Sequence, residues 1–360
     1  MSALGATSGE AAAVETATPP PPRGLNRTIR GTQAVAGWLF VAPAAVILVV
    51  FLVVPIVLAL FVSFTDWSGL TNPLTGGAHW VGLDNYKSLL TEPGLTQSGF
   101  MTSLRNNFYY VLFVVPAQTA LALGLAVLVN NRFLRGKGFF RTAFYFPSVT
   151  SSIAITLVFM FLFNPSGVVN VLLSKVGLHG PNWLIDENGL FQVVAGAFGV
   201  HSTPGWAQHQ VLGLSLWDWL SGPSIGMCVL IIMVTWTTSG SFMLMFLAAL
   251  QGISEDLDEA AAIDGANAWK RFWHITLPML RPTLVLVITL GLIGTWQVFD
   301  QVYLLGPNNP TIPTPAYYSY RESFANFHFG VGAAVAFLLF LLIVVLTVIQ
   351  RRLLPEDIQS

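Results

Sequence analysis

Apolar residues gather in six long runs that are separated by shorter polar connections. A helix needs roughly 20 apolar residues to cross a hydrocarbon core about 30 Å thick. Six runs reach this length, at about residues 38–63, 108–129, 143–163, 225–250, 283–304 and 331–349. They lack the alternation of a barrel strand, and open strands would leave backbone groups unpaired in lipid. The pattern therefore predicts an all-α polytopic membrane protein with six transmembrane helices.

The composition supports a protein that resides in a bilayer. The chain of 360 residues is 54% hydrophobic and only 9% charged, with a mean hydropathy of +0.67. Soluble folds carry far more charge on their surfaces. The formal net charge of −1 predicts no general affinity for nucleic acid, and the single cysteine, Cys228, excludes an internal disulfide framework.

We expect a transmembrane domain at residues 38–352 with one tail at each end. Residues 1–37 are small, polar and rich in proline, and they predict a disordered cytoplasmic tail without the apolar core of a signal peptide. Residues 353–360 would form a short cytoplasmic C-terminal tail.

The basic residues set the expected orientation, because cytoplasmic flanks are enriched in lysine and arginine. Twelve of the 16 fall on one side of the predicted spans, and the other side keeps Lys87, Arg105, Lys175 and Arg321. We therefore expect a multi-pass protein of the cell (plasma) membrane with both termini in the cytoplasm.

Residues 255–265, EDLDEAAAIDG, place five carboxylates in the predicted cytoplasmic connection between the fourth and fifth spans. Ser254 can cap a helix whose first turn is acidic, where exposed backbone amides and the helix dipole favour negative charge. Apolar side chains recur at four-residue spacing, so the pattern predicts a short amphipathic helix that ends near Gly265. A second amphipathic piece, ANAWKRFWHITLP, is expected to stop at Pro278.

The stretch EAAAIDGANAWKRFWHITLPMLRP, residues 259–282, resembles the EAA loop of permease subunits of ATP-binding-cassette importers. In that family the first helix of the loop is a coupling helix, which docks into a groove on a cytoplasmic ATPase subunit. Within a loop expected at 253–278, the resemblance assigns ATPase coupling to Glu259, Ala260, Ala261, Asp264, Gly265, Leu277 and Pro278. The alternative, a helix lying on the lipid surface, fits poorly because such helices favour lysine and arginine.

Longer stretches resemble the carbohydrate-uptake permeases of the maltose-transporter type, over roughly residues 38–350. The similar stretches are WVGLDNYKSLL, LRGKGFFRTAFYFPS, VFDQVYLL and SFANFHFGVGAAVAF. The chain departs from that family at residues 306–310, where GPNNP replaces a glycine-rich turn, and in an extracytoplasmic insertion at about 186–221.

The resemblance implies the type I importer permease fold and inward translocation of a mono-, di- or oligosaccharide by alternating access. It implies four kinds of partner besides membrane lipid: an ATPase dimer, a second permease subunit, an extracytoplasmic solute-binding protein and the sugar itself. The sequence contains no GxxxxGK[ST] phosphate loop, so ATP and Mg would be bound by the separate ATPase. We expect neither a catalytic residue nor a cofactor in this subunit.

Polar residues within the spans are candidates for a solute pathway. The positions that line the pathway in maltose-type permeases correspond here to Ser148, Ser152, Thr237, Thr238, Ser241, Gly291, Thr295 and Val298. The two serines lie one turn apart, and the last three residues follow i, i+4, i+7, so each set shares a helix face. The alternative is that single hydroxyls bond their own helix or join neighbouring helices.

Aromatic and acidic side chains lie beside these positions. Trp236, Trp296 and Phe299 could stack on a sugar ring, although tryptophan also marks the membrane interface. Asp300 lies near the outer end of the fifth span, where a role in bonding the external loop is slightly favoured.

The insertion contains two apolar patches on either side of HSTPGWAQHQ. Each patch is too short to span a bilayer, so we expect it to rest on the outer interface or to cover the mouth of the permease. His201 and His209 are expected to be solvated, because no cysteine or adjacent acidic ligand completes a metal site.

Two other functions stay open. The nearer is an importer for another small solute, such as a glycerol phosphate ester, although no clear arginine or lysine lies within the spans to bind an anion. The farther is an intramembrane enzyme, which is disfavoured because Cys228 and Asp300 fall in different spans with no histidine partner.

Overall fold

A computed structural model describes residues 26–72, 76–199, 203–306 and 311–353. The chain divides into two compact units, residues 1–58 and 59–360. Most of the predicted N-terminal tail, His201, residues 307–310 of the GPNNP turn and the last seven residues lie outside the described ranges. The tail prediction differs from the structure in one respect, because the chain is helical from Asn26 onward.

The first predicted span is one long apolar helix. It consists of α1 (Asn26–Leu48), a π-helical turn η1 (Val49–Val53) and α2 (Val54–Val62). In the π turn the Val54 amide donates to the Val49 carbonyl, which is five residues earlier. Pro55 directly follows and has no N–H to donate, so the wider turn lets the backbone stay helical past it.

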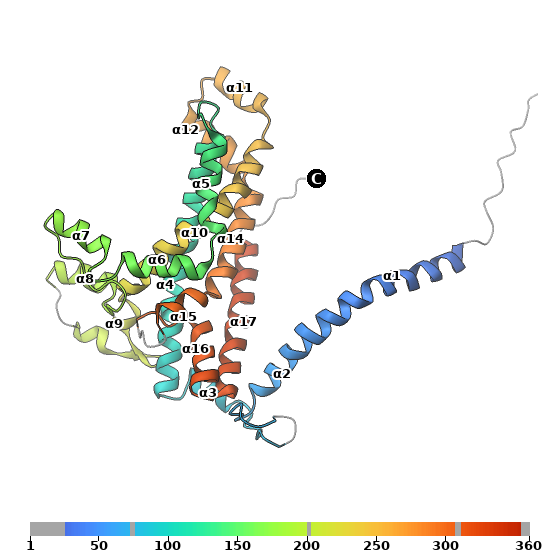
Figure 1. Ribbon diagram of the computed structural model, residues 1–360, viewed down its shortest axis with the longest axis vertical. Coiled ribbons are helices and arrows are strands. Elements are labelled where there is room, and N and C mark those ends of the chain that lie inside the picture. Colours follow the sequence, from blue (N-terminus) through green and yellow to red (C-terminus); the bar gives the residue numbers. More distant parts are fainter. Residues whose placement is uncertain (1–25, 73–75, 200–202, 307–310, 354–360) are drawn as a thin grey trace, which may run out of the picture. The chain divides into compact units, whose positions relative to one another are not determined.

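Four long helices form the centre of the second unit (Figure 1). They are α4 (Leu95–Asn130), α10 (Ile225–Gln251), α14 (Arg281–Trp296) and α17 (Phe329–Leu353). Helix α10 packs along α4, and α14 packs against both α4 and α17. Helices α4, α10 and α17 are each long and apolar enough to cross a membrane, and α14 is so together with the residues that follow it up to Leu305, which confirms these spans of the predicted set.

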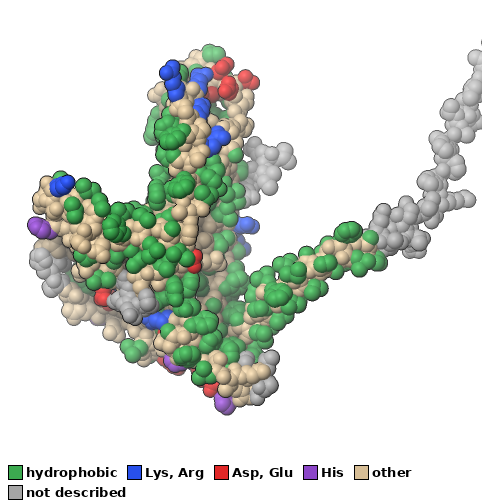
Figure 2. All heavy atoms as spheres, in the orientation of Figure 1, with side chains coloured by type: hydrophobic (Ala, Val, Ile, Leu, Met, Phe, Trp, Pro, Cys, Tyr) green, Lys and Arg blue, Asp and Glu red, His purple; other side chains and the backbone are tan. Residues whose placement is uncertain are grey.

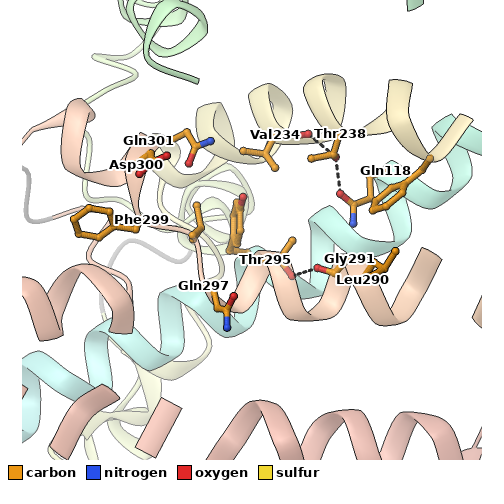
Figure 3. A pocket seen from close by; sticks show the side chains of 14 residues that line it. Gln118, Val234, Thr238, Leu290, Gly291, Thr295, Gln297, Phe299, Asp300 and Gln301 are labelled. Carbon is orange, nitrogen blue, oxygen red and sulfur yellow. Dashed lines mark hydrogen bonds between the residues drawn. The ribbon is translucent and has the colours of Figure 1, made fainter. Parts of the chain in front are cut away.

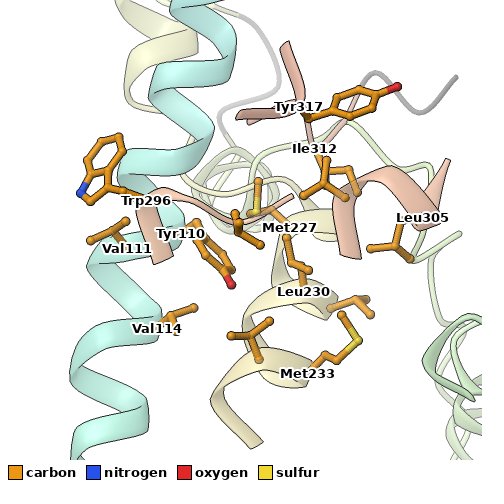
Figure 4. Packing of buried hydrophobic residues seen from close by; sticks show 14 of the residues in the cluster. Tyr110, Val111, Val114, Met227, Leu230, Met233, Trp296, Leu305, Ile312 and Tyr317 are labelled. Atoms are coloured by element: carbon orange, nitrogen blue, oxygen red, sulfur yellow. The ribbon is translucent and has the colours of Figure 1, made fainter. Parts of the chain in front are cut away.

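Buried apolar side chains hold this bundle together. One cluster joins α4, α10 and the end of α14 through Tyr110, Val114, Met227, Leu230 and Trp296 (Figure 4). A second cluster, farther along α4 and α10, contains Ala122, Ala126, Met243, Phe246 and Leu280. Small residues allow close approach at one more point: a Cβ added at Gly240 of α10 would collide with the backbone of Phe144.

The third predicted span is not one straight helix, as the length of its apolar run had suggested. It consists of α5 (Lys137–Val149) and α6 (Ser152–Leu162), which meet at a bend of 93°. Thr150 and Ser151 have extended backbone conformations, with ψ of 145° and 131°. Pro147 lies just before them and cannot donate a helical hydrogen bond, so the bend has a local cause.

The fifth span is also interrupted. After α14 ends at Trp296, residues 297–299 leave the helix, and α15 (Asp300–Leu305) follows and packs against α6. The two broken spans therefore meet each other at their breaks.

Short elements lie at one side of the second unit and at its end away from α11 (Glu255–Ile263) (Figure 1). They are α3 (Asp84–Leu90), α7 (Val168–Lys175), α8 (Leu190–Ala197), the 3₁₀ turn η2 (Gly205–Gln208), the antiparallel hairpin β1 (Gln210–Val211) and β2 (Leu214–Ser215), α9 (Leu216–Trp219), α16 (Pro315–Tyr320) and the π turn η4 (Arg321–Ala325).

The predicted insertion at 186–221 is tied to α4. The Arg105 guanidinium donates to the Asp218 carbonyl at 3.1 Å, and the Tyr109 hydroxyl donates to the Trp219 carbonyl at 2.6 Å. Arg105 belongs to the part of α4 that the apolar pattern had left outside the second span, whereas Tyr109 lies at the predicted start of that span. His209 is exposed, as expected for a solvated residue.

Candidate functional site

A cavity of about 300 Å³ lies where α4, α10, α14 and the start of α15 meet, and we call it the larger cavity. Each helix contributes a polar side chain to its lining: Gln118 from α4, Thr238 from α10, Thr295 from α14 and Gln301 from α15 (Figure 3). The cavity therefore exists because α14 stops short and leaves room between the helices.

The smaller cavity, of about 170 Å³, lies at the bend between α5 and α6. Pro147, Ser148 and Ser152 line it together with Thr237 of α10. Thr238 and Gln301 line both cavities, so the two spaces are neighbours. The bend and the interruption of the fifth span thus shape one polar region in an otherwise apolar bundle.

Seven of the eight residues predicted for the solute pathway line one or both cavities. Ser148, Ser152 and Thr237 line the smaller cavity, Thr238 lines both, and Gly291, Thr295 and Val298 line the larger cavity. Ser241 lines neither.

Most of these hydroxyl groups donate to a carbonyl of their own helix, as the alternative interpretation expected, whereas Ser152 donates to another helix. Thr237 donates to the Val234 carbonyl at 3.1 Å, and Thr295 donates to the Gly291 carbonyl at 2.7 Å. The single hydroxyl proton of Thr238 is shared between the Val234 carbonyl, at 2.7 Å, and Gln118 Oε1, at 2.6 Å. A hydroxyl that donates in this way still has lone pairs, so it can accept a hydrogen bond from a ligand. The two interpretations are therefore compatible.

The lining residues of α4 and the amides beside the helix break are not among the residues that the sequence predicts for the pathway. Tyr110 and Gln118 come from α4, and Gln297 and Gln301 come from the break and from α15. Gln118 had a detectable signal, because an amide within the apolar run FVVPAQTALAL is expensive unless it is bonded or functional. No local pattern could show that α4 faces the hydroxyl residues of α10.

The predicted aromatic residues take different places. Phe299 lines the larger cavity, whereas Trp296 is buried in the apolar cluster and Trp236 packs on Phe159, with ring centroids 6.0 Å apart. Asp300 begins α15, lines the larger cavity and accepts a hydrogen bond from the Ser152 hydroxyl at 3.4 Å. This partner belongs to α6, so the carboxylate joins the two interrupted spans and not the external loop.

The loop predicted to couple to an ATPase begins with the predicted acidic helix, α11 (Glu255–Ile263), at the end of the second unit opposite α3 and α16 (Figure 1). The Ser254 hydroxyl caps it by accepting from the Asp256 amide at 3.3 Å, as predicted. Figure 2 shows acidic side chains gathered over this helix, beside basic ones. Glu259, Ala260 and Asp264 are exposed, so a partner has free access to them.

The helix ends in a turn that needs glycine. The Ala266 amide donates to the Ala261 carbonyl at 2.9 Å and the Gly265 amide donates to the Ala262 carbonyl at 3.1 Å, which is the Schellman pattern of helix ends. Gly265 has a φ of +78°, a conformation that side chains other than glycine rarely adopt.

A second, basic piece returns from this turn. It comprises α12 (Ala268–Arg271), the π turn η3 (Phe272–Thr276) and α13 (Leu277–Met279). Arg271 forms an ion pair with Asp258 of α11 at 2.8 Å, which ties the two pieces together.

The prediction that the second piece stops at Pro278 was wrong. Pro278 lies inside α13, and the backbone stays helical to the start of α14. The π turn explains this difference: the Leu277 amide donates to the Phe272 carbonyl, so the wider backbone accommodates a proline that cannot donate. Coupling loop and fifth span are thus continuous.

Apolar helices that enclose polar cavities, with one exposed helical loop outside the bundle, define a membrane transport protein. Residues 118–356 match the family described as "Binding-protein-dependent transport system inner membrane component", and the chain belongs to this family. It is a permease subunit of an ATP-binding-cassette importer, as the resemblance in its sequence implied.

Relatives and solved structures agree with this assignment. The chain is 33% identical to the lactose transport system permease protein LacF of Rhizobium radiobacter, over 88% of this chain and 93% of LacF. It is 29% identical to the arabinooligosaccharides transport system permease protein AraP of Bacillus subtilis, over 89% of each. A crystal structure of a bacterial importer of the acidic polysaccharide alginate has the same fold, with a TM-score of 0.66 and 20% identity over 92% of this chain and all of that one.

Proposed function

We propose that this permease carries an uncharged sugar inward. The larger cavity carries the proposal, because amide and hydroxyl groups make up its polar lining apart from Asp300. Such groups suit the hydroxyls of a sugar, and the ring of Phe299 suits the apolar side of a sugar ring. Among the described residues, the lining of either cavity includes no lysine or arginine, which a phosphate ester would need.

The names of relatives support a sugar as cargo. LacF is named for lactose and AraP for arabinooligosaccharides, and a third relative, MsmF of Streptococcus mutans, is named a multiple sugar-binding transport system permease protein. The sugars in these names differ, so the relatives support a sugar as the class of solute but do not indicate a particular sugar.

We further propose that separate ATPase subunits bind ATP and Mg and drive transport through α11, with both termini in the cytoplasm. The exposed carboxylates of α11 support this role. The helical path from its turn through α12, η3 and α13 into α14 supports it too, because a pull on α11 would pass along this path to the lining residues Gly291 and Thr295. A second permease subunit and an extracytoplasmic solute-binding protein would complete the transporter. One structurally similar protein, a bacterial alginate transporter, was solved in complex with a periplasmic protein that holds an alginate pentasaccharide.

The decisive experiment fills the larger cavity. We expect Thr295→Trp to reduce uptake of radiolabelled mono- and disaccharides to background in the complete transporter, because Thr295 is only 4% exposed and its side chain lines the cavity. The ATPase subunits should still copurify, since the coupling loop is untouched. Uptake is measured in cells and in proteoliposomes.

A matched control separates blockage from misfolding. Leu286→Trp adds the same ring to the same helix at an exposed position that lines neither cavity, and it should leave uptake near the wild-type rate. Unchanged uptake by Thr295→Trp, at wild-type amounts in the membrane, would remove the larger cavity from the pathway.

A further inference from the structure

At the larger cavity, two polar atoms of α4 are buried without a hydrogen-bond partner among the described residues. They are the Tyr110 hydroxyl oxygen and the Gln118 amide nitrogen Nε2, and both side chains line the cavity. Tyr110 is 0% exposed and Gln118 is 1% exposed. A buried polar group that lacks a partner costs about 1–3 kcal/mol, so two of them at one cavity call for an explanation.

The Gln118 amide is held from two sides. At one end its Oε1 accepts from the Thr238 hydroxyl of α10 at 2.6 Å (Figure 3). At the other end Nε2 lies against Gly291 of α14, where an added Cβ would collide with it. The amide therefore bridges α10 and α14 through α4, and its free hydrogen-bonding capacity is fixed in place at the cavity.

We infer that Gln118 and Tyr110 form a hydrogen-bonding site on α4 for hydroxyl groups of the cargo, and that this site helps to select which sugar is carried. The inference rests on the proposed function. A sugar hydroxyl both donates and accepts, so it can pair with the amide whichever of its two atoms faces the solute, and with the phenol. Binding would satisfy both buried groups at once, which favours a solute with hydroxyls over one of similar size without them.

The test uses variants that remove hydrogen bonds but keep shape. Gln118→Met and Tyr110→Phe are placed in the complete transporter, and uptake is measured for lactose, maltose, cellobiose and trehalose and for monodeoxy derivatives of the best cargo. Loss of one hydrogen bond should raise the apparent KM for that cargo roughly tenfold. For one deoxy derivative, the variant and the wild type should have the same apparent KM, because this derivative lacks the hydroxyl that the side chain binds.

The chain offers a matched control for the amide. Gln350 of α17 accepts from the Thr289 hydroxyl at 2.9 Å and also has a buried Nε2 without a partner, but it lines neither cavity. Gln350→Met should therefore keep the wild-type preference among the monodeoxy derivatives. Gly291→Ala should act like Gln118→Met by displacing the amide, whereas Gly124→Ala, on an open face of α4, should not.

The outcomes distinguish this inference from the proposed function. If wild type carries none of the sugars, the proposed function fails. If wild type carries one and Gln118→Met and Tyr110→Phe keep the wild-type preference among its deoxy derivatives, the α4 site is refuted while sugar transport stands. The α4 site would also be refuted if Gln118→Met and Tyr110→Phe lost uptake equally for every sugar and Gln350→Met lost it to the same extent. Such a result would indicate a structural role for the two side chains.

Discussion

A single backbone position sets how α11 is presented. Gly265 adopts a φ of +78°, and no atom lies within 4 Å of a Cβ added there, so alanine would meet strain without a clash. We expect Gly265→Ala to cost about 1–2 kcal/mol in the turn, which corresponds to a roughly five- to thirtyfold lower population of the intact turn. Sugar-stimulated ATPase activity of the complete transporter should fall severalfold.

The control for this prediction is another helix-terminal glycine. Gly252 ends α10 with a φ of −85°, which alanine adopts readily, so Gly252→Ala should keep wild-type stimulation. Equal activities of the two variants would show that the left-handed turn is not needed for coupling.

The residues of the candidate site divide into those that local pattern reveals and those that it does not. Gly291 and Thr295 lie one turn apart on α14 and both line the larger cavity, which agrees with the helix face that their spacing predicts. Val298 lines the cavity too, but α14 ends at Trp296, so the predicted helix face does not extend to Val298. Gln118 belongs to another helix, and its contact with Thr238 spans 120 positions. Periodicity describes one helix at a time, so it carries no information on such a contact.

At the scale of elements, straight spans were predictable and broken ones were not. Helix α10 extends from Ile225 to Gln251 against a predicted 225–250, because the length of an apolar run is a local property. The bend between α5 and α6 is invisible to hydropathy, since the predicted apolar run at 143–163 continues across it. Helix α4 begins 13 residues before the predicted start at Phe108, because polar residues of its first turns bond to α9 and to the segment before α16.

The exposed face of α11 gives the element-scale prediction. Glu259→Lys reverses the charge at the position where we propose that an ATPase groove docks, and losing a buried charge pair at an interface costs about 2–5 kcal/mol. We expect sugar-stimulated ATPase activity to fall about tenfold or more, with normal amounts of the permease in the membrane because Glu259 is exposed. The measurement is ATP hydrolysis by the reconstituted transporter with its solute-binding protein.

Glu187→Lys provides the matched comparison, since Glu187 is exposed but lies in the external insertion. It should leave stimulation intact. Full stimulation in Glu259→Lys would contradict the assignment of α11 as the coupling helix.

At the scale of the whole molecule, the orientation in the bilayer links all proposed roles. The distribution of basic residues predicts the 130–137 connection and α11 on the cytoplasmic side, and α3 and the insertion on the other. The single cysteine makes this testable, because Cys228→Ala yields a background without thiols. Phe133→Cys and Leu95→Cys then place one thiol at each end of α4, where the native side chains are 83% and 92% exposed.

A membrane-impermeant maleimide should label Leu95→Cys in intact cells and label Phe133→Cys only after permeabilisation. Both positions are freely accessible, so a difference in labelling reports the side of the membrane and not burial within the protein. The reverse pattern would put α11 outside the cell, beyond reach of any ATP-hydrolysing partner. In that case the cavities and their polar lining would still describe a solute path, but the exposed carboxylates of α11 would need a different partner.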